Sequence, residues 1–329
     1  MTELTRRSLL AGTAAAAALP LAGIVPTDAA APLSGKQAPG FYRYKVGTME
    51  VTAVTDGLTI GPLSDTYVAN ASKDAVNAAL EAGFMARDRA TQPYTPVVVN
   101  TGGKLVVIDT GLGPAMLQQS KGTAGQFQTN LAAAGIDRMA VDAVVISHFH
   151  GDHINGLIGP DGGAAYPNAE VMVPAAEYKF WMDDGNMSRA ADAAKPAFQN
   201  ARRVFGVVGS KVTQYDPGKD VAPGITSVSS PGHTVGHCSY IVAAGSDRVL
   251  VQVDITAGMA QLFVRNPEWQ FGFDMDKQLA VQTRRKLYDM AVAEKMLVQG
   301  FHFPFPGIAN IEKDGNGYRL VPIFWNPTI

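Results

Sequence analysis

The segment 141–146, together with the residues that follow it, constrains the fold of this chain more than any other feature. The segment is apolar except for Asp142, and it leads directly into Ser147-His-Phe-His-Gly-Asp-His153. A short apolar run of this kind is typical of a strand buried on both faces, as in a sheet that helices cover on both sides. In such sheets, ligands bind where the strands end. The sequence therefore predicts an α/β fold with a functional site directly after this strand.

The side chains after this strand suit a metal site. His148 and His150 are alternate residues of one loop and are placed to share one ion, while Asp152 and His153 can face a second ion. Neutral imidazoles and carboxylates are ligands that suit Zn²⁺ and its neighbours. The chain has 6 histidines in 329 residues, so three histidines and an aspartate at these offsets should arise by chance in about one of 10⁴ such chains.

Three further donors follow other predicted strands. His233 follows the strand-like segment 225–229, Asp254 ends the segment 248–253, and His302 follows the segment 296–300. Each also has a structural alternative, since His302 has the aromatic neighbours of a core histidine and Asp254 can cap the next segment. Together with the first motif they complete a donor set for two ions, in which Asp254 is placed to bridge.

The composition excludes several other classes of protein. The net charge is −2 and the pI is about 6.3, so the chain has no basic excess with which to bind a nucleic-acid backbone. Cys238 is the single cysteine, which excludes an intrachain disulfide, a cysteine-rich zinc module and an iron–sulfur site. We interpret Cys238 as a small buried residue rather than a ligand.

The rest of the chain alternates between strand-like and helix-like segments. Hairpins are predicted at 41–46 with 49–55 and at 95–100 with 104–108, further strands at 239–243 and 318–321, and long helices at 116–134 and 276–295. The segments 104–108 and 248–253 each deliver a carboxylate, Asp109 and Asp254, at the carboxyl end of a strand. This repetition indicates two sheets packed together with helices outside.

The N-terminus has the pattern of an export signal. Arg6 and Arg7 precede an alanine-rich apolar run from Ala11 to Val25, and small residues follow it. This pattern predicts a twin-arginine-type signal over 1–30, a linker over 31–40 and a folded domain over 41–329, hence a periplasmic or secreted protein. The alternative is a membrane anchor, but about fifteen apolar residues fall short of the ~20 that a span needs.

The motif and the donors downstream resemble a known family. His148-x-His150-x-Asp152-His153, followed by His233, Asp254 and His302, is similar to the ligand pattern of the metallo-β-lactamase-fold hydrolases. Within them, the chain resembles methyl parathion hydrolase and its lactonase relatives, through the segments Asp109-Thr-Gly111, Gly232-His-Thr-x-Gly-His237 and His302-x-Pro-Phe-Pro-Gly307.

The resemblance implies a four-layer αβ/βα sandwich with a dinuclear site at one edge. By the family pattern, His148, His150 and His233 would hold one ion, Asp152, His153 and His302 the other, and Asp254 would bridge them. Asp109 would orient a ligand histidine, although it can equally be a turn residue before Gly111. His237 would lie outside the metal ligands, and relatives of this kind suggest a homodimer.

These expectations lead to a hydrolytic mechanism. Two divalent ions, of which zinc fits the donors best, share a water molecule and lower its pKa toward 7, so that hydroxide is available at neutral pH. Asp254 would bridge the ions, and Asp152 would also relay the proton to the leaving group. No serine or cysteine nucleophile is needed, and a redox relative of this fold would require a flavin domain for which the chain has no room.

The substrate is less well indicated. Four aromatic residues are expected to line the pocket, the alternative being that they are ordinary core: Trp181, Phe198, Phe263 and Trp269. Ala257 stands where homoserine lactonases usually have a tyrosine, and the segment 112–125 is longer than in methyl parathion hydrolase. We therefore expect a lactonase or aryl esterase with side activity on phosphotriesters. A dedicated phosphotriesterase, a β-lactamase and a metal-bound binding protein are the alternatives.

Overall fold

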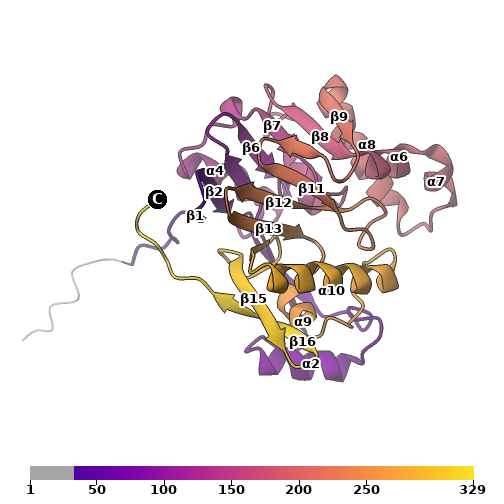
Figure 1. Cartoon of the computed structure of the whole chain (residues 1–329). Coiled ribbons are helices and arrows are strands. Elements are labelled where there is room, and N and C mark those ends of the chain that lie inside the picture. Colours follow the sequence, from indigo (N-terminus) through magenta and orange to yellow (C-terminus); the bar gives the residue numbers. More distant parts are fainter. Residues whose placement is uncertain (1–32) are drawn as a thin grey trace, which may run out of the picture. The chain divides into compact units, whose positions relative to one another are not determined.

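Two mixed sheets of seven strands each form the centre of the structure (Figure 1), a computed structural model that describes residues 33–329. In their spatial order, the strands of the first sheet are β1 Phe41–Val46, β2 Met49–Val54, β5 Val97–Asn100, β6 Leu105–Ile108, β7 Ala143–Val145, β8 Glu170–Pro174 and β9 Val212–Tyr215. Those of the second are β10 Asp220–Ala222, β11 Ile225–Ser229, β12 Cys238–Ala244, β13 Asp247–Val253, β14 Leu297–Gly300, β15 Ile308–Asp314 and β16 Gly317–Pro322.

Residues 39–329 form one compact unit. Its helices are α2 Lys73–Ala82, α3 Pro114–Gln119, α4 Phe127–Ala133, α5 Gly151–Ile154, α6 Ala175–Met182, α7 Asp184–Arg189, α8 Lys195–Val208, α9 Ala260–Arg265 and α10 Lys277–Ala293. None of the helices within residues 33–329 has both the length and the apolar character needed to cross a membrane. The export signal predicted over 1–30 lies outside the described residues and stays a prediction.

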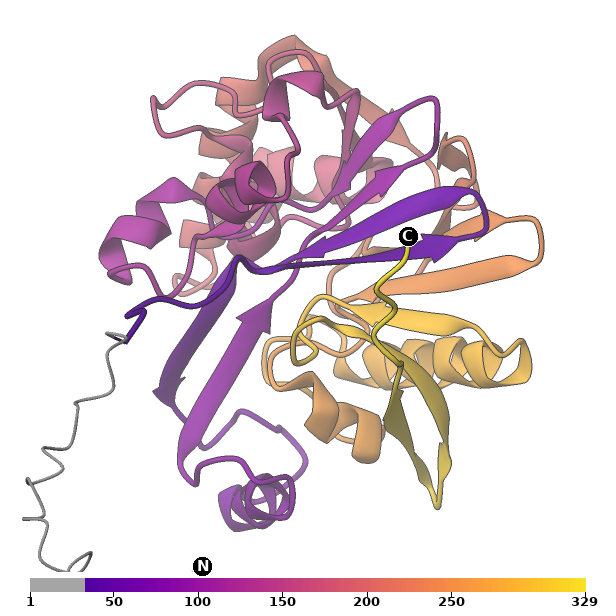
Figure 2. The same ribbon diagram turned by 90° about the vertical axis from the view of Figure 1, so that its left-hand side faces the viewer.

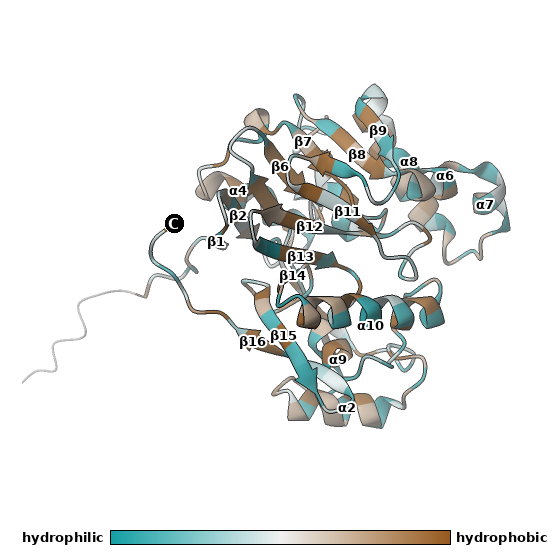
Figure 3. Cartoon of the chain, viewed as in Figure 1, coloured by the Kyte–Doolittle hydropathy of each residue, from teal (hydrophilic) through white to brown (hydrophobic). Residues whose placement is uncertain are grey.

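Three hydrophobic clusters show that the unit has four layers. Between the sheets, Val51 and Val99 of the first pack with Val242 and Val251 of the second. Helices α4 and α8 cover the outer face of the first sheet, and α9 and α10 cover the outer face of the second. Figure 3 shows the apolar residues concentrated on the strands that these layers enclose. The expected α/β sandwich, with helices outside two packed sheets, is confirmed.

A two-stranded ribbon extends from the first sheet. Its strands, β3 Gly57–Pro62 and β4 Arg89–Tyr94, pair antiparallel and enclose α2 in sequence. Figure 2 shows the ribbon in indigo and violet, leading to α2. Tyr67, Leu80, Leu262 and Phe263 belong to a separate small core in this region, which joins α2 to α9. No strand or helix was predicted between residues 56 and 94, because apolar alternation there is weak.

The strand ends that carry the motifs lie at one edge of each sheet. Strands β6 and β7 are parallel neighbours, with Ile108 opposite Val145, so Asp109 and the loop 146–150 leave the first sheet side by side. Strands β13 and β14 are also parallel, which places Asp254 beside the loop that holds His302. Asp109 and Val253 both adopt positive φ, at +59° and +53°, a conformation that costs energy in residues other than glycine and that is common at functional sites.

The single helix predicted over 116–134 is wrong. The structure has two short helices there, α3 and α4, separated by the turn 120–126. Gly122 and Gly125 adopt φ of +89° and +80° within this turn, which a continuous right-handed helix does not allow. The apolar positions of both helices happen to keep helical spacing across the turn, and this produced the error. The predicted hairpins and the helix that corresponds to α10 are confirmed within a few residues at each end.

Candidate metal centre

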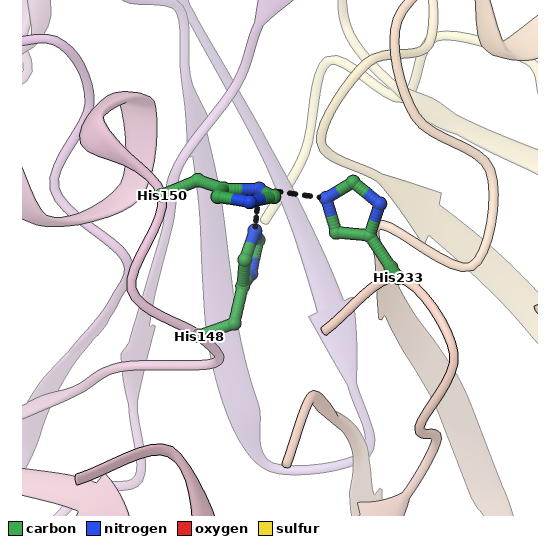
Figure 4. A group of neighbouring side chains, drawn as sticks. All are labelled: His148, His150 and His233. Carbon is green, nitrogen blue, oxygen red and sulfur yellow. Dashed lines mark hydrogen bonds between the residues drawn. The ribbon is translucent and has the colours of Figure 1, made fainter. Parts of the chain in front are cut away.

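Three histidines converge with their ring nitrogens facing one another (Figure 4). His148 Nε2 lies 3.1 Å from His150 Nδ1, which lies 2.9 Å from His233 Nε2. His148 and His150 come from the loop after β7 of the first sheet, and His233 comes from the loop between β11 and β12 of the second. The two sheets therefore contribute to one site, in agreement with the positions of these histidines after predicted strand ends.

Asp152, His153 and His302 form a second group beside the first. Asp152 Oδ2 lies 3.5 Å from His153 Nε2 and 3.5 Å from His302 Nε2. Asp254 stands between the two groups: its Oδ2 lies 3.3 Å from His233 Nε2 and 3.2 Å from His302 Nε2, while its Oδ1 lies 3.5 Å from His153 Nε2. All seven predicted donors are thus brought together.

The donor set fits metal ions better than it fits hydrogen bonding. His153 Nε2 and Asp254 Oδ1 are buried and have no hydrogen-bond partner, which is costly for polar atoms unless a ligand satisfies them. Ring nitrogens that face one another at about 3 Å also compete for a single proton, whereas one cation accepts a lone pair from each. Imidazole nitrogens with carboxylate oxygens are the donors that zinc and its neighbours take.

The comparison with protein families agrees with this geometry. A model of the Metallo-beta-lactamase superfamily matches residues 92–287. The chain belongs to this superfamily.

Among curated proteins, the N-acyl homoserine lactonase AttM of Rhizobium johnstonii is 32% identical over 145 residues, which cover 42% of this chain and 49% of AttM. A probable metallo-hydrolase of Mycobacterium tuberculosis is 28% identical over 185 residues, covering 47% of this chain and 54% of that protein. The chain therefore matches about half the length of these curated relatives.

Solved structures of the superfamily extend the likeness to most of the chain. The hydrolase AbOPH of the beta lactamase superfamily superposes with a TM-score of 0.79 and 27% identity, covering 88% of this chain and 100% of that chain. AidC, a dizinc quorum-quenching lactonase solved with a homoserine product, has a TM-score of 0.79 and 21% identity, covering 87% and 98%. These likenesses confirm the metallo-beta-lactamase fold.

In this superfamily member, the surroundings of the donors set their charge. Burial lowers the pKa of the His150 imidazole to about 3 and holds the pKa of His148 well below its ordinary value. Burial opposes ionisation of Asp152, but His153 and His302 lower the pKa of this carboxyl to about 2. The pKa values of His153 and His233 are raised despite burial, chiefly by Asp254 for His153 and by Asp274 for His233.

A buried carboxylate orients two of the histidines in the first sheet. His153 Nδ1 donates to Asp109 Oδ2 at 2.8 Å, and Ser147 Oγ donates to the same oxygen at 2.7 Å. Ser147 Oγ in turn accepts from His148 Nδ1 at 2.9 Å. Asp109 therefore fixes which ring nitrogen of His153 faces the centre, and acts on His148 through Ser147. This contact agrees with the orienting role that the resemblance implied for Asp109.

In the second sheet, His233 Nδ1 donates to Asp274 Oδ1 at 2.8 Å, and His302 Nδ1 donates to the carbonyl of Pro93 at 2.8 Å. His237 lies outside the donor groups, and its Nε2 accepts from the backbone N–H of Asp254 at 3.1 Å. Sequence reasoning missed Asp274, because 41 residues separate it from His233 and no local motif surrounds it.

A cavity of about 390 Å³ opens onto the donors. Its wall includes Leu112, Ala257, Phe271 and Phe273, with Gln92, Tyr94 and Asn155 as polar members. The aromatic residues predicted to line it do not do so. Trp181 and Phe198 are buried in the outer core of the first sheet, Phe263 is buried in the small core near α2, and Trp269 packs against that core. Sequence reasoning identified them as apolar but could not show which space they fill.

Proposed function

We propose that the chain is a metal-dependent hydrolase that opens lactones or cleaves aryl esters. The observation that carries this proposal is the convergence of seven donors from both sheets on two adjacent groups, with Asp254 between them. Two bound divalent ions, zinc before others, would supply an activated water and an acid for the oxygen that gains charge. The dizinc lactonase AidC, which shares the fold, supports zinc.

The residues of the chain would divide the remaining work. His148, His150 and His233 would hold one ion, and Asp152, His153 and His302 the other, with Asp254 shared. Asp152 borders the cavity and is the one partly exposed carboxylate among the donors, so it is placed to pass a proton to the leaving group. Apart from His150, which is also partly exposed, the other donors are buried, and this burial keeps bulk water away from them and strengthens their electrostatic interactions.

The cavity supports an apolar acyl or aryl substrate. Leu112, Phe271 and Phe273 provide apolar wall, and an adjoining cavity of about 310 Å³ shares Leu112 and Asn155 with the first. The N-acyl homoserine lactonases among the curated relatives favour a lactone. Ala257 lines the cavity at the position where such lactonases usually have a tyrosine, so the lactone need not be a homoserine lactone.

A phosphotriesterase is the second candidate. It is favoured by the segments Gly232-His-Thr-x-Gly-His237 and His302-x-Pro-Phe-Pro-Gly307, which resemble those of methyl parathion hydrolase. A metal-activated water can attack phosphorus as well as carbon, so both activities can belong to one site.

The test is a substrate panel on the zinc-loaded wild type and on Asp254→Asn. The panel contains aryl lactones, homoserine lactones, aryl esters, methyl parathion and a cephalosporin. We expect lactone or ester hydrolysis to give the highest kcat/KM, and Asp254→Asn to lower it by about 100-fold or more, equivalent to about 2.7 kcal/mol. Metal analysis should give two ions per wild-type chain. No turnover with two ions bound would favour a binding protein, and an unaffected Asp254→Asn would contradict the mechanism.

A further inference from the structure

Glu177 is a buried carboxylate for which the proposed mechanism has no use. It lies in α6 with 0% of its surface exposed. Within residues 33–329, no lysine, arginine or histidine lies within salt-bridge distance of it, although most buried carboxylates have a cationic partner. A buried charge without a counter-ion is costly, so its retention requires strong hydrogen bonds.

Those hydrogen bonds come from two different ligand loops. Glu177 Oε2 accepts from the backbone N–H of Phe149 at 3.2 Å, and Phe149 lies between His148 and His150. Glu177 Oε1 accepts from the backbone N–H of Gly236 at 2.7 Å, and Gly236 follows His233 by three residues. One carboxylate therefore spans the loop after β7 and the loop between β11 and β12, which belong to different sheets.

The helix that carries Glu177 is held tightly against the second of these loops. A side chain at Gly236 would place its Cβ 2.6 Å from the backbone nitrogen of Glu177 and 2.8 Å from Ala176 Cβ, so only glycine allows this approach. Trp181 Nε1 donates to Glu177 Oε2 at 2.6 Å and fixes the carboxylate from within α6. On the other side of the ligand loops, Cys238 N donates to Ser147 O at 3.1 Å and joins the same two segments.

We propose that Glu177 is a positioning residue of the metal centre, which holds the His148–His150 loop and the His233 loop at the separation that the first ion requires. The inference rests on the proposed function only in that the three histidines bind an ion. Glu177 touches neither the donors nor the cavity, and acts through the backbone of each loop.

The chemistry of the contact demands a carboxylate. Both oxygens accept N–H groups, and a carboxylate is the side chain of this size with two acceptor oxygens. In Glu177→Gln, which has almost the same volume, the amide oxygen can serve Phe149 and Trp181, but the amide NH₂ then faces the N–H of Gly236. Two donors face each other at that point, so the His233 loop should move away from α6.

The test compares wild type, Glu177→Gln and Glu170→Gln, each stripped of metal and reloaded. Glu170 is an exposed residue of β8 and controls for the change of charge. Zinc affinity is measured by competition with a chromophoric chelator, and the absorption spectrum of the Co²⁺-loaded protein reports ligand geometry. We expect Glu177→Gln to lower zinc affinity by about 10- to 100-fold and to change the Co²⁺ spectrum, while Glu170→Gln matches wild type in both.

Equal zinc affinity and identical Co²⁺ spectra in wild type and Glu177→Gln would overturn the inference. If Glu177→Gln does not fold, Glu177→Asp takes its place: it keeps two acceptor oxygens but is one methylene shorter, so it cannot reach the backbone N–H groups of both Phe149 and Gly236. Unchanged zinc affinity in a folded Glu177→Asp would then overturn the inference. If the wild type itself binds no zinc or Co²⁺, the proposed metal centre fails before the role of Glu177 is in question.

Discussion

At the scale of single residues, four of the donor histidines are each fixed by a second contact, made by the ring nitrogen that faces away from the centre. His153 and His233 direct one ring nitrogen to the centre and the other to a buried carboxylate, Asp109 or Asp274. Such a carboxylate selects the tautomer and makes the imidazole a stronger ligand. The contacts behind the donors should therefore control metal affinity almost as strongly as the donors do.

Asp274→Asn tests this for the second sheet. Its amide retains at most a weaker, uncharged contact with His233, so we expect zinc affinity to fall by about 10- to 100-fold. Arg284, whose guanidinium lies 3.8 Å from Asp274, keeps its hydrogen bonds to the carbonyls of Ile255, Pro267 and Trp269 and should keep the fold intact. Competition with a chelator measures the affinity. Asp192→Asn, at an exposed residue, is the control, and equal affinity in the two variants would contradict the prediction.

Metal binding should also release protons. The pKa values of His153 and His233 are raised above 6.5, so at pH 6 both side chains are cationic in the metal-free chain, with a proton on each ring nitrogen. An ion must displace one of these protons from each ring. We expect about two protons to be released per chain at pH 6 and the affinity to rise as pH increases toward the raised pKa values. Calorimetric titration of zinc in two buffers with different ionisation enthalpies counts these protons, and a count of zero would be incompatible with the prediction.

At the scale of elements, the predictable features are those set by local periodicity. The β1–β2 hairpin and α10 follow from alternation, a turn glycine and helical spacing, and the structure confirms both. The segment 116–134 shows the limit of prediction from periodicity. Its apolar residues keep helical spacing across the turn 120–126, but the helix itself is interrupted there. The loops after strand ends are harder to predict, because some of their residues must adopt left-handed conformations in crowded surroundings.

Gly111 allows a direct test of this crowding. It lies two residues after Asp109 and has a φ of +75°, and a Cβ at this position would lie 2.6 Å from Asp56 Cγ. Gly102 has a similar φ of +83°, but no atom lies within 4 Å of its Cβ position. Gly102→Ala should therefore lower the free energy of unfolding only by the cost of a positive φ in alanine. Gly111→Ala should lower the free energy of unfolding by about 1–3 kcal/mol more. Urea denaturation of the metal-free variants measures the difference, and equal losses would show that crowding at Gly111 is not limiting.

At the scale of the whole molecule, the metal centre connects the two sheets. The first sheet supplies His148, His150, Asp152 and His153, and the second supplies His233, Asp254 and His302. Ions bound between them would stabilise the packing of one sheet on the other, because they would bind the folded chain and not the separated loops.

Removal of the ions should therefore lower Tm. At a free metal concentration of 100 Kd, one site contributes about 2.7 kcal/mol, which for a chain of this size corresponds to a loss of roughly 4–5 °C per site on chelation. Differential scanning calorimetry of loaded and chelated protein measures the shift, and Asp254→Asn should show a smaller one. An unchanged Tm on removal of ions shown to be bound would mean that they do not support the interface between the sheets.

The sequence by itself indicated which residues would hold the metal ions. The dense motif after a buried strand, the donors after other predicted strands and the resemblance to a known family together named all seven donors that the structure brings together, because ligand type and strand periodicity are local properties. Only the tertiary structure decided what surrounds them. It packed Trp181 and Phe198 into the outer core of the first sheet instead of the cavity, and it placed Asp274 behind His233. A pattern can show that a side chain is buried, but which space it fills depends on how distant segments pack together, which no local segment encodes.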